Sequence, residues 1–102
     1  EHVADLNALM ERRAEKMKAS LPAVGDVRLI GALLGIELVR DRETREKAVD
    51  EAEKILYRCL EQGLSFKISQ GNVLTLAPPL IISEAELSRA LDIVEEAIRS
   101  LT

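Results

Sequence analysis

The chain is poor in aromatic residues and in the residue types that most often carry chemistry. Its 102 residues include no tryptophan, one tyrosine, one phenylalanine, one histidine and one cysteine. So few aromatic side chains cannot build an aromatic cage or a platform for stacked bases. The ring of a bound cofactor would also find little to stack on. The core must be built from leucine, isoleucine, valine and alanine.

Long apolar runs and an excess of positive charge are also missing. No stretch approaches the roughly 20 apolar residues of a membrane-spanning helix. The net charge of -4 disfavours nucleic acid, whose phosphates bind clustered lysine and arginine. Residues 1–20 are charged throughout and lack the apolar segment of a signal peptide. A single cysteine forms no internal disulfide. We therefore expect a cytoplasmic protein that binds neither nucleic acid nor membrane.

The spacing of apolar residues predicts three helices. Pro22 ends the first, the second covers residues 46–62 with Gly63 at its left-handed C-cap, and the third follows a capping-box pattern of Ser83 and Glu86. Their apolar faces carry Val3, Leu6, Met10, Ala14, Met17 and Leu21; then Ala48 or Val49, Ala52, Ile55, Leu56, Cys59 and Leu60; then Leu87, Ala90, Leu91, Val94, Ala97, Ile98 and Leu101.

Four β-prone segments separate the helices, at residues 27–30, 33–39, 64–69 and 73–77. Residues 70–72 make a short hairpin connection, and Pro78 with Pro79 ends the last strand because proline donates no ladder hydrogen bond. The charged segment 41–47 is expected to be exposed and mobile.

This order of elements predicts one α+β domain over residues 1–102, a small, mostly antiparallel sheet of three to four strands with three helices packed on one face. No element remains to cover the other face. Leu33 and Val39 alternate with Leu34, Ile36 and Leu38, and Val73 and Ala77 alternate with Leu74 and Leu76, so both faces of these strands carry apolar side chains. We expect the uncovered face, on which Thr75 lies with Val73, to self-associate in the isolated chain.

The residues alone form no active site. His2 is the single histidine and lies beside the terminus, and Cys59 is on an apolar helix face, which favours core packing. The adjacent pairs Asp50-Glu51 and Glu95-Glu96 point in different directions on their helices, so they are solvated faces rather than acid–base pairs. No glycine-rich phosphate loop occurs. The lysines, at positions 16, 18, 47, 54 and 67, lack the shielded surroundings that a Schiff-base lysine needs.

Five motifs follow one another in a fixed order. They are Gly25-Asp26-Val27-Arg28-Leu29-Ile30-Gly31, Gly35-Ile36-Glu37-Leu38-Val39, Arg40-Asp41-Arg42-Glu43-Thr44, the helix end from Cys59 to Leu64, and the stretch from Asn72 to Ser83 with its double proline. Together they resemble the C-terminal small domain of a class III pyridoxal-phosphate-dependent aminotransferase, in the group of 4-aminobutyrate aminotransferase and dialkylglycine decarboxylase. The resemblance covers nearly the whole chain. Leu29 departs from it, since the family has a glycine there.

The resemblance implies a parent enzyme in which a large domain, absent from this chain, binds pyridoxal phosphate through a lysine and transfers amino groups. The small domain would form one wall of the substrate cleft. Its partners would be the large domain of its own chain and a second subunit in a homodimer. No catalytic, cofactor-binding or metal-binding residue is expected here, so the chain alone would be inactive.

One substrate-binding position is implied by the resemblance, and Thr75 occupies it. Many family members have an arginine there, which binds the substrate's carboxylate through two parallel hydrogen bonds. Threonine offers one hydroxyl and no charge. The substrate is then an ω-amine, or its carboxylate is bound elsewhere.

A second interpretation comes from the order strand, helix, strand, strand, helix over residues 33–101. This order is close to a ferredoxin-like module, which would serve as a small-molecule-binding or dimerising regulatory domain. A catalytic lysine encoded upstream would favour the aminotransferase, whereas an unrelated neighbouring domain would favour the regulatory module.

Overall fold

A computed structural model describes residues 2–101, and this part of the chain forms three helices and five strands. In order they are α1 (His2–Ser20), β1 (Val24–Ile30), β2 (Leu33–Asp41), β3 (Glu46–Lys47), α2 (Val49–Glu61), β4 (Lys67–Ser69), β5 (Val73–Leu76) and α3 (Glu84–Arg99). None of the helices in this range has both the length and the apolar character needed to cross a bilayer.

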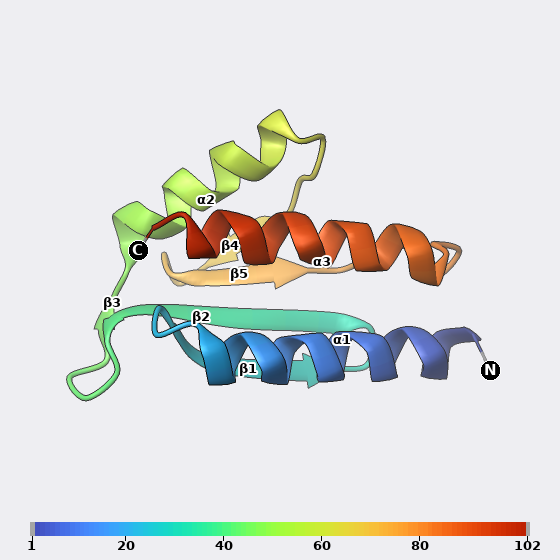
Figure 1. The fold of residues 1–102 in the computed structure, drawn as a ribbon, viewed down its shortest axis with the longest axis horizontal. Helices are drawn as coiled ribbons and strands as arrows, with labels where there is room; N and C mark the ends of the chain where they lie inside the picture. The colour runs from blue at the N-terminus through green and yellow to red at the C-terminus, as the bar shows by residue number, and fades with distance from the viewer. Residues whose placement is uncertain (1, 102) are drawn as a thin grey trace.

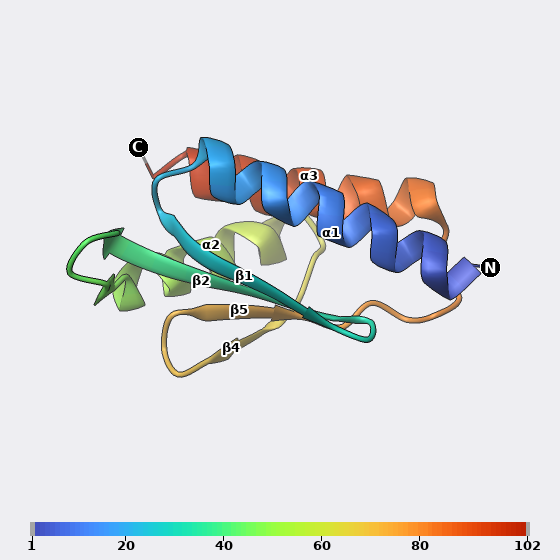
Figure 2. The same ribbon diagram turned by 90° about the horizontal axis from the view of Figure 1, so that it is seen from below.

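The strands form an antiparallel sheet with the helices on one of its faces. The strand order is β1-β2-β5-β4, and β3 pairs with the end of β2 to complete a five-stranded sheet. In Figure 1, α1 and α3 run side by side along the sheet. Figure 2 shows the three helices on one side of the strands and nothing on the other. The predicted α+β class is confirmed, with one more strand than expected.

The core lies between this sheet and the helices. Leu34, Ile36 and Leu38 alternate along β2 and are fully buried, while the residues between them face the uncovered side. They pack against the helix faces predicted from the spacing, with Met10 and Met17 from α1, Ile55 and Cys59 from α2, and Leu87, Leu91 and Ile98 from α3 among the fully buried residues. Aliphatic and methionine side chains supply most of this buried apolar surface.

An arginine from the turn between β2 and β3 binds the carbonyl groups at the end of α1. The Arg42 guanidinium donates to the carbonyl oxygens of Lys18 at 2.5 Å, Leu21 at 2.8 Å and Pro22 at 3.2 Å. The last carbonyls of a helix have no partner within it, and a positive charge there also favours the helix dipole. Arg42 therefore joins the turn between β2 and β3 to the C-terminal end of α1.

Residues 41–47 are exposed, as predicted, and they form a hairpin turn. Asp41 pairs with Glu46 across β2 and β3, and its Oδ1 accepts hydrogen bonds from the backbone N–H groups of Glu43 and Thr44. Because residues 46–47 belong to this hairpin, α2 begins at Val49 and not at residue 46 as predicted. The predicted C-cap is confirmed, since Gly63 has a positive φ of 85° and the N–H of Leu64 donates to Cys59.

Two strand boundaries also differ from the prediction. β1 begins at Val24 rather than at residue 27, because Val24 still pairs with Leu38 across a register shift between Val24 and Asp26. β4 begins at Lys67 rather than at residue 64. The turn at residues 70–72 connects β4 and β5 as expected, with positive φ at Gln70 and Gly71.

The Ser83 capping box is present at the start of α3. The Ser83 hydroxyl accepts from the Glu86 backbone N–H at 3.1 Å, and the Glu86 carboxylate accepts from the Ser83 N–H at 3.1 Å. We expect Ser83→Ala to lower the free energy of unfolding by about 1 kcal/mol, because the Glu86 N–H loses the hydroxyl that accepts its hydrogen bond. Urea melts measure the loss. Ser83→Asn, which keeps a capping oxygen, should retain most of the stability.

Arg40 joins the hairpin to the first turn of α2. Its Nε lies 2.9 Å from Oε2 of Glu51, and its two terminal nitrogens reach Glu46 at 3.2 Å and Asp50 at 3.4 Å. The hydrogen bond from Arg40 lowers the pKa of Glu51, and the hydrogen bond from the backbone of Ser83 lowers the pKa of Glu86.

Both carboxyls therefore make the fold less stable in acid. A folded-state pKa below the ordinary value of 4.5 contributes stability above that pH, which is lost as the pH falls through the folded-state pKa. We expect the free energy of unfolding to fall progressively below about pH 4.5. Glu51→Gln should lower stability at pH 7 and flatten this acid dependence. Glu53→Gln, an exposed position of the same helix, is the control, and an equal flattening by both variants would contradict the assignment to Glu51.

Candidate functional site

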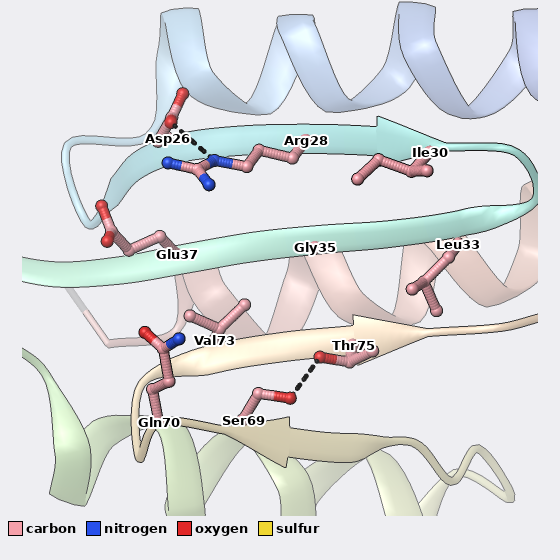
Figure 3. Close-up of a pocket in the computed structure, with 10 residues that line it drawn as sticks. All are labelled: Asp26, Arg28, Ile30, Leu33, Gly35, Glu37, Ser69, Gln70, Val73 and Thr75. Carbon is pink, nitrogen blue, oxygen red and sulfur yellow. Dashed lines mark hydrogen bonds and ion pairs between the residues drawn. The ribbon is translucent and has the colours of Figure 1, made fainter.

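Thr75 lies on the uncovered face of the sheet, in the middle of β5. The strand register places it between Gly35 of β2 and Lys67 of β4. Its Oγ1 is 3.1 Å from the Oγ of Ser69, so the two hydroxyls share a hydrogen bond, as Figure 3 shows. The predicted placement of Thr75 on the same face as Val73 is confirmed. Gly35 has no side chain, which leaves the space beside Thr75 open.

A concavity of about 270 Å³ runs across this face from β1 to β4. Apolar side chains from the β1–β2 hairpin and β5 form part of its floor, and hydroxyl, amide and charged groups form the rest. Its lining residues are Asp26, Arg28, Ile30, Leu33, Gly35, Glu37, Ser69, Gln70, Val73 and Thr75 (Figure 3). The face is therefore mixed rather than uniformly apolar, and Val39, expected to be exposed on it, is buried.

The charged groups at the β1 end of the concavity are paired among themselves. Asp26 lies 3.4 Å from the Lys18 ammonium and 3.5 Å from the Arg28 guanidinium. Burial raises the pKa of Asp26, but the Val27 backbone N–H and the Lys18 ammonium lower it more, so its pKa lies below the ordinary value. Asp26 therefore carries negative charge at neutral pH. Glu37 forms an ion pair with Arg45.

The other candidate residues named from the sequence are buried or are bonded to neighbouring residues of the fold. Burial raises the pKa of the Cys59 thiol to about 11, which leaves it protonated and unreactive at neutral pH. Nε2 of His2 lies 2.7 Å from the Ile82 carbonyl oxygen. The acidic pairs are only partly solvated, because Glu51 pairs with Arg40, and Glu95 pairs with Arg99 at 3.0 Å. Within residues 2–101, no three histidine, cysteine, aspartate or glutamate side chains gather as metal ligands.

The lysines of residues 2–101 are not placed as a pyridoxal-phosphate site requires. Four of the lysines, at positions 16, 47, 54 and 67, are exposed, and Lys18 is half-buried beside Asp26. None lies in a shielded pocket of the kind that a Schiff-base lysine requires. The concavity holds two carboxylates and no glycine-rich loop that would surround a phosphate. The cofactor's lysine and phosphate site are therefore not found among these residues.

Lys67 is the residue that sequence reasoning did not connect with Thr75. Its exposure was expected, but its position directly across from Thr75 depends on the register of the β4–β5 hairpin. The sequence did hold a signal for this arrangement. Residues 67 and 69 before the short turn and residues 73 and 75 after it occupy every second position of their strands. That pattern placed the three polar side chains on one face without fixing which of them are neighbours.

Comparison with known proteins identifies relatives over almost the whole chain. A family model described as Aminotransferase class-III matches residues 1–98. A protein of Vibrio splendidus named (R)-1-hydroxy-2-aminoethylphosphonate ammonia-lyase is 53% identical over 92 residues, covering 90% of this chain and 19% of its own length. A leucine/methionine racemase of Thermococcus litoralis is 45% identical over 93 residues, covering 91% of this chain and 21% of its own length.

The fold agrees with solved structures of the same kind. A Bacillus anthracis aminotransferase superposes with a TM-score of 0.87 at 34% identity, over 98% of this chain and 24% of that one. The chain thus spans about a fifth of the length of the curated relatives that it matches. The ferredoxin-like regulatory alternative receives no support from these comparisons.

Proposed function

The chain belongs to the class III aminotransferase family, and we propose on that premise that it is the C-terminal small domain of a pyridoxal-phosphate-dependent enzyme. The match over residues 1–98, in a chain that spans about a fifth of its relatives, is the observation that carries the proposal. The remaining length supplies the large domain, with the lysine and the phosphate site that these residues lack. The parent is a cytoplasmic homodimer.

In this enzyme the uncovered sheet face forms one wall of the substrate cleft. The wall supplies hydroxyl donors from Thr75 and Ser69, apolar surface from Leu33 and Val73, and open space above Gly35. It orients a small amine and excludes water from one side. The helices cover the opposite face and hold the strands in position.

The reaction that we propose is transfer of an amino group from a primary amine to a keto acid. Pyridoxal phosphate, when bound, supplies the electron sink for bond breaking at the amino-bearing carbon. A second candidate is elimination of ammonia from an amino-hydroxyphosphonate. The name of the relative that is 53% identical favours it, because the similarity is substantial and that protein is an ammonia-lyase.

The full-length protein distinguishes the two reactions. It is incubated with (R)-1-hydroxy-2-aminoethylphosphonate, the substrate in the relative's name, with and without a panel of keto acids. Amino transfer predicts a new amino acid only when a keto acid is present, with no free ammonia. Elimination predicts ammonia without any keto acid. If neither product forms with this substrate or with a panel of simple amines, both proposed reactions are wrong.

The isolated chain should bind no cofactor covalently. Residues 1–102 are mixed with pyridoxal phosphate, reduced with borohydride and analysed by mass spectrometry, with the full-length protein as the positive control. We expect no single lysine of the isolated chain to be labelled stoichiometrically, because its lysines are exposed or half-buried rather than shielded. Stoichiometric labelling of one lysine would show that a cofactor site lies within these residues.

A further inference from the structure

Three polar side chains cluster on the uncovered face of the β4–β5 hairpin. The register pairs Lys67 with Thr75 and Ser69 with Val73, so residues 67, 69, 73 and 75 share one face of the two strands. Directly opposite residues of an antiparallel pair have Cβ atoms about 5 Å apart. The Lys67 side chain therefore starts beside Thr75, which lines the concavity together with Ser69.

These groups have hydrogen-bonding capacity to spare. Ser69 and Thr75 bond to one another at 3.1 Å, which uses one of their two hydroxyl protons and leaves the other free to donate outward. The side chain of Lys67 makes no hydrogen bond or ion pair with any residue in the range 2–101. The arginines at the other end of this face are paired, Arg28 with Asp26 and Arg45 with Glu37. Lys67 is thus the unpaired positive charge beside the two hydroxyls.

An ammonium beside two hydroxyls suits a tetrahedral oxyanion. Lysine is a compact point charge with three rotatable donors, and it binds phosphate-type groups well, whereas planar bidentate binding of a carboxylate requires a guanidinium. The ammonium, with its three rotatable N–H groups, and the one free hydroxyl proton can face different oxygens of a tetrahedral anion.

We propose that Lys67, Ser69 and Thr75 form a subsite for the phosphonate group of an amine substrate, on the uncovered face of the β4–β5 hairpin. The proposal rests on the proposed function, because the amino group of such a substrate must reach a cofactor bound by the large domain. Within it, Lys67 supplies the charge that Thr75 lacks, and the two hydroxyls orient the anion.

Binding to the full-length protein tests the subsite independently of turnover. The probes are aminoethylphosphonate, β-alanine as its carboxylate counterpart, and neohexylamine, in which a neutral tert-butyl group replaces the phosphonate. Calorimetry measures each dissociation constant. We expect Lys67→Met to weaken aminoethylphosphonate binding about tenfold or more, as expected for a lost hydrogen bond to a charged group. Neohexylamine binding should not change.

Further variants separate this subsite from a general effect of charge or folding. Lys54→Met removes an exposed lysine from α2, on the opposite face, and should leave all three probes unaffected. Thr75→Val, which keeps the shape and removes the hydroxyl, should weaken aminoethylphosphonate alone. Thr75→Arg should shift the preference toward β-alanine, because a guanidinium binds a carboxylate through two parallel hydrogen bonds.

The possible results lead to different conclusions. Loss of aminoethylphosphonate binding in Lys67→Met, with neohexylamine binding unchanged, supports the subsite. If the wild-type protein binds aminoethylphosphonate but does not turn it over, the subsite stands and the proposed reaction is wrong. Equal loss for both amines, or no loss for either, overturns the subsite. Tighter binding of inorganic phosphate than of aminoethylphosphonate also overturns it, because the anion bound would then be free phosphate.

Discussion

Leu91→Ala should lower the free energy of unfolding by about 2–5 kcal/mol, because it opens a cavity in the core. Leu91 lies in the middle of α3, and its side chain is 0% exposed. Its removal leaves a cavity among Met10, Leu76 and Leu87, which are themselves buried and held by the sheet and helices. Urea denaturation followed by circular dichroism measures the loss.

Two further substitutions show whether burial is the cause. Leu80→Ala changes the same residue type at a position that is 53% exposed, and it should alter stability by less than about 0.5 kcal/mol. Ser83→Ala should fall between the two, because it removes a cap and no core volume. A greater loss from Ser83→Ala than from Leu91→Ala would contradict the central position of Leu91 in the core.

The helices were predictable because each follows a clear apolar period with local end signals. The buried residues of α1 and α3 lie on the faces expected from spacing, and the cap of α3 follows from Ser83 and Glu86 alone. On α2 the buried residues are Ala52, Ile55 and Cys59, whereas Leu60, which was expected on the same face, is 45% exposed. The strand β3 was not predictable in this way, since two charged residues carry no alternation. It forms because Glu46 and Lys47 continue a hairpin with β2, and the start of α2 shifts with it.

The site was predictable only in part, for a similar reason. The resemblance to the family placed Thr75 at a substrate-binding position, and strand alternation placed it on the uncovered face. The pairing of Lys67 with Thr75 depends on hairpin register, which a one-residue slip would change completely. Contacts between residues distant in sequence, such as Arg42 with the end of α1, leave no periodic pattern and appear only in the fold.

Gly25→Ala should lower the free energy of unfolding by about 1–3 kcal/mol, because a methyl group there overlaps a buried side chain. A Cβ atom at residue 25 would lie 2.8 Å and 2.9 Å from the two γ-carbons of Val39. Val39 is 2% exposed and has little room to move away. Gly25 lies at the register shift of β1, where its carbonyl oxygen also accepts a hydrogen bond from Arg45.

A double-mutant cycle with Val39→Ala tests this overlap directly. Val39→Ala alone loses buried apolar surface and should destabilise the chain, but it also removes both γ-carbons from the space that a methyl group at residue 25 would occupy. The double variant should therefore be more stable than the sum of the single losses predicts. Gly35→Ala is the matched control on the same sheet face, because its nearest neighbour, the Cγ1 of Val73, would lie at an ordinary 3.5 Å. Strictly additive losses for Gly25→Ala and Val39→Ala would mean that residue 39 does not limit the space at residue 25, and the packing of the β1 register shift against β2 would then differ from that described.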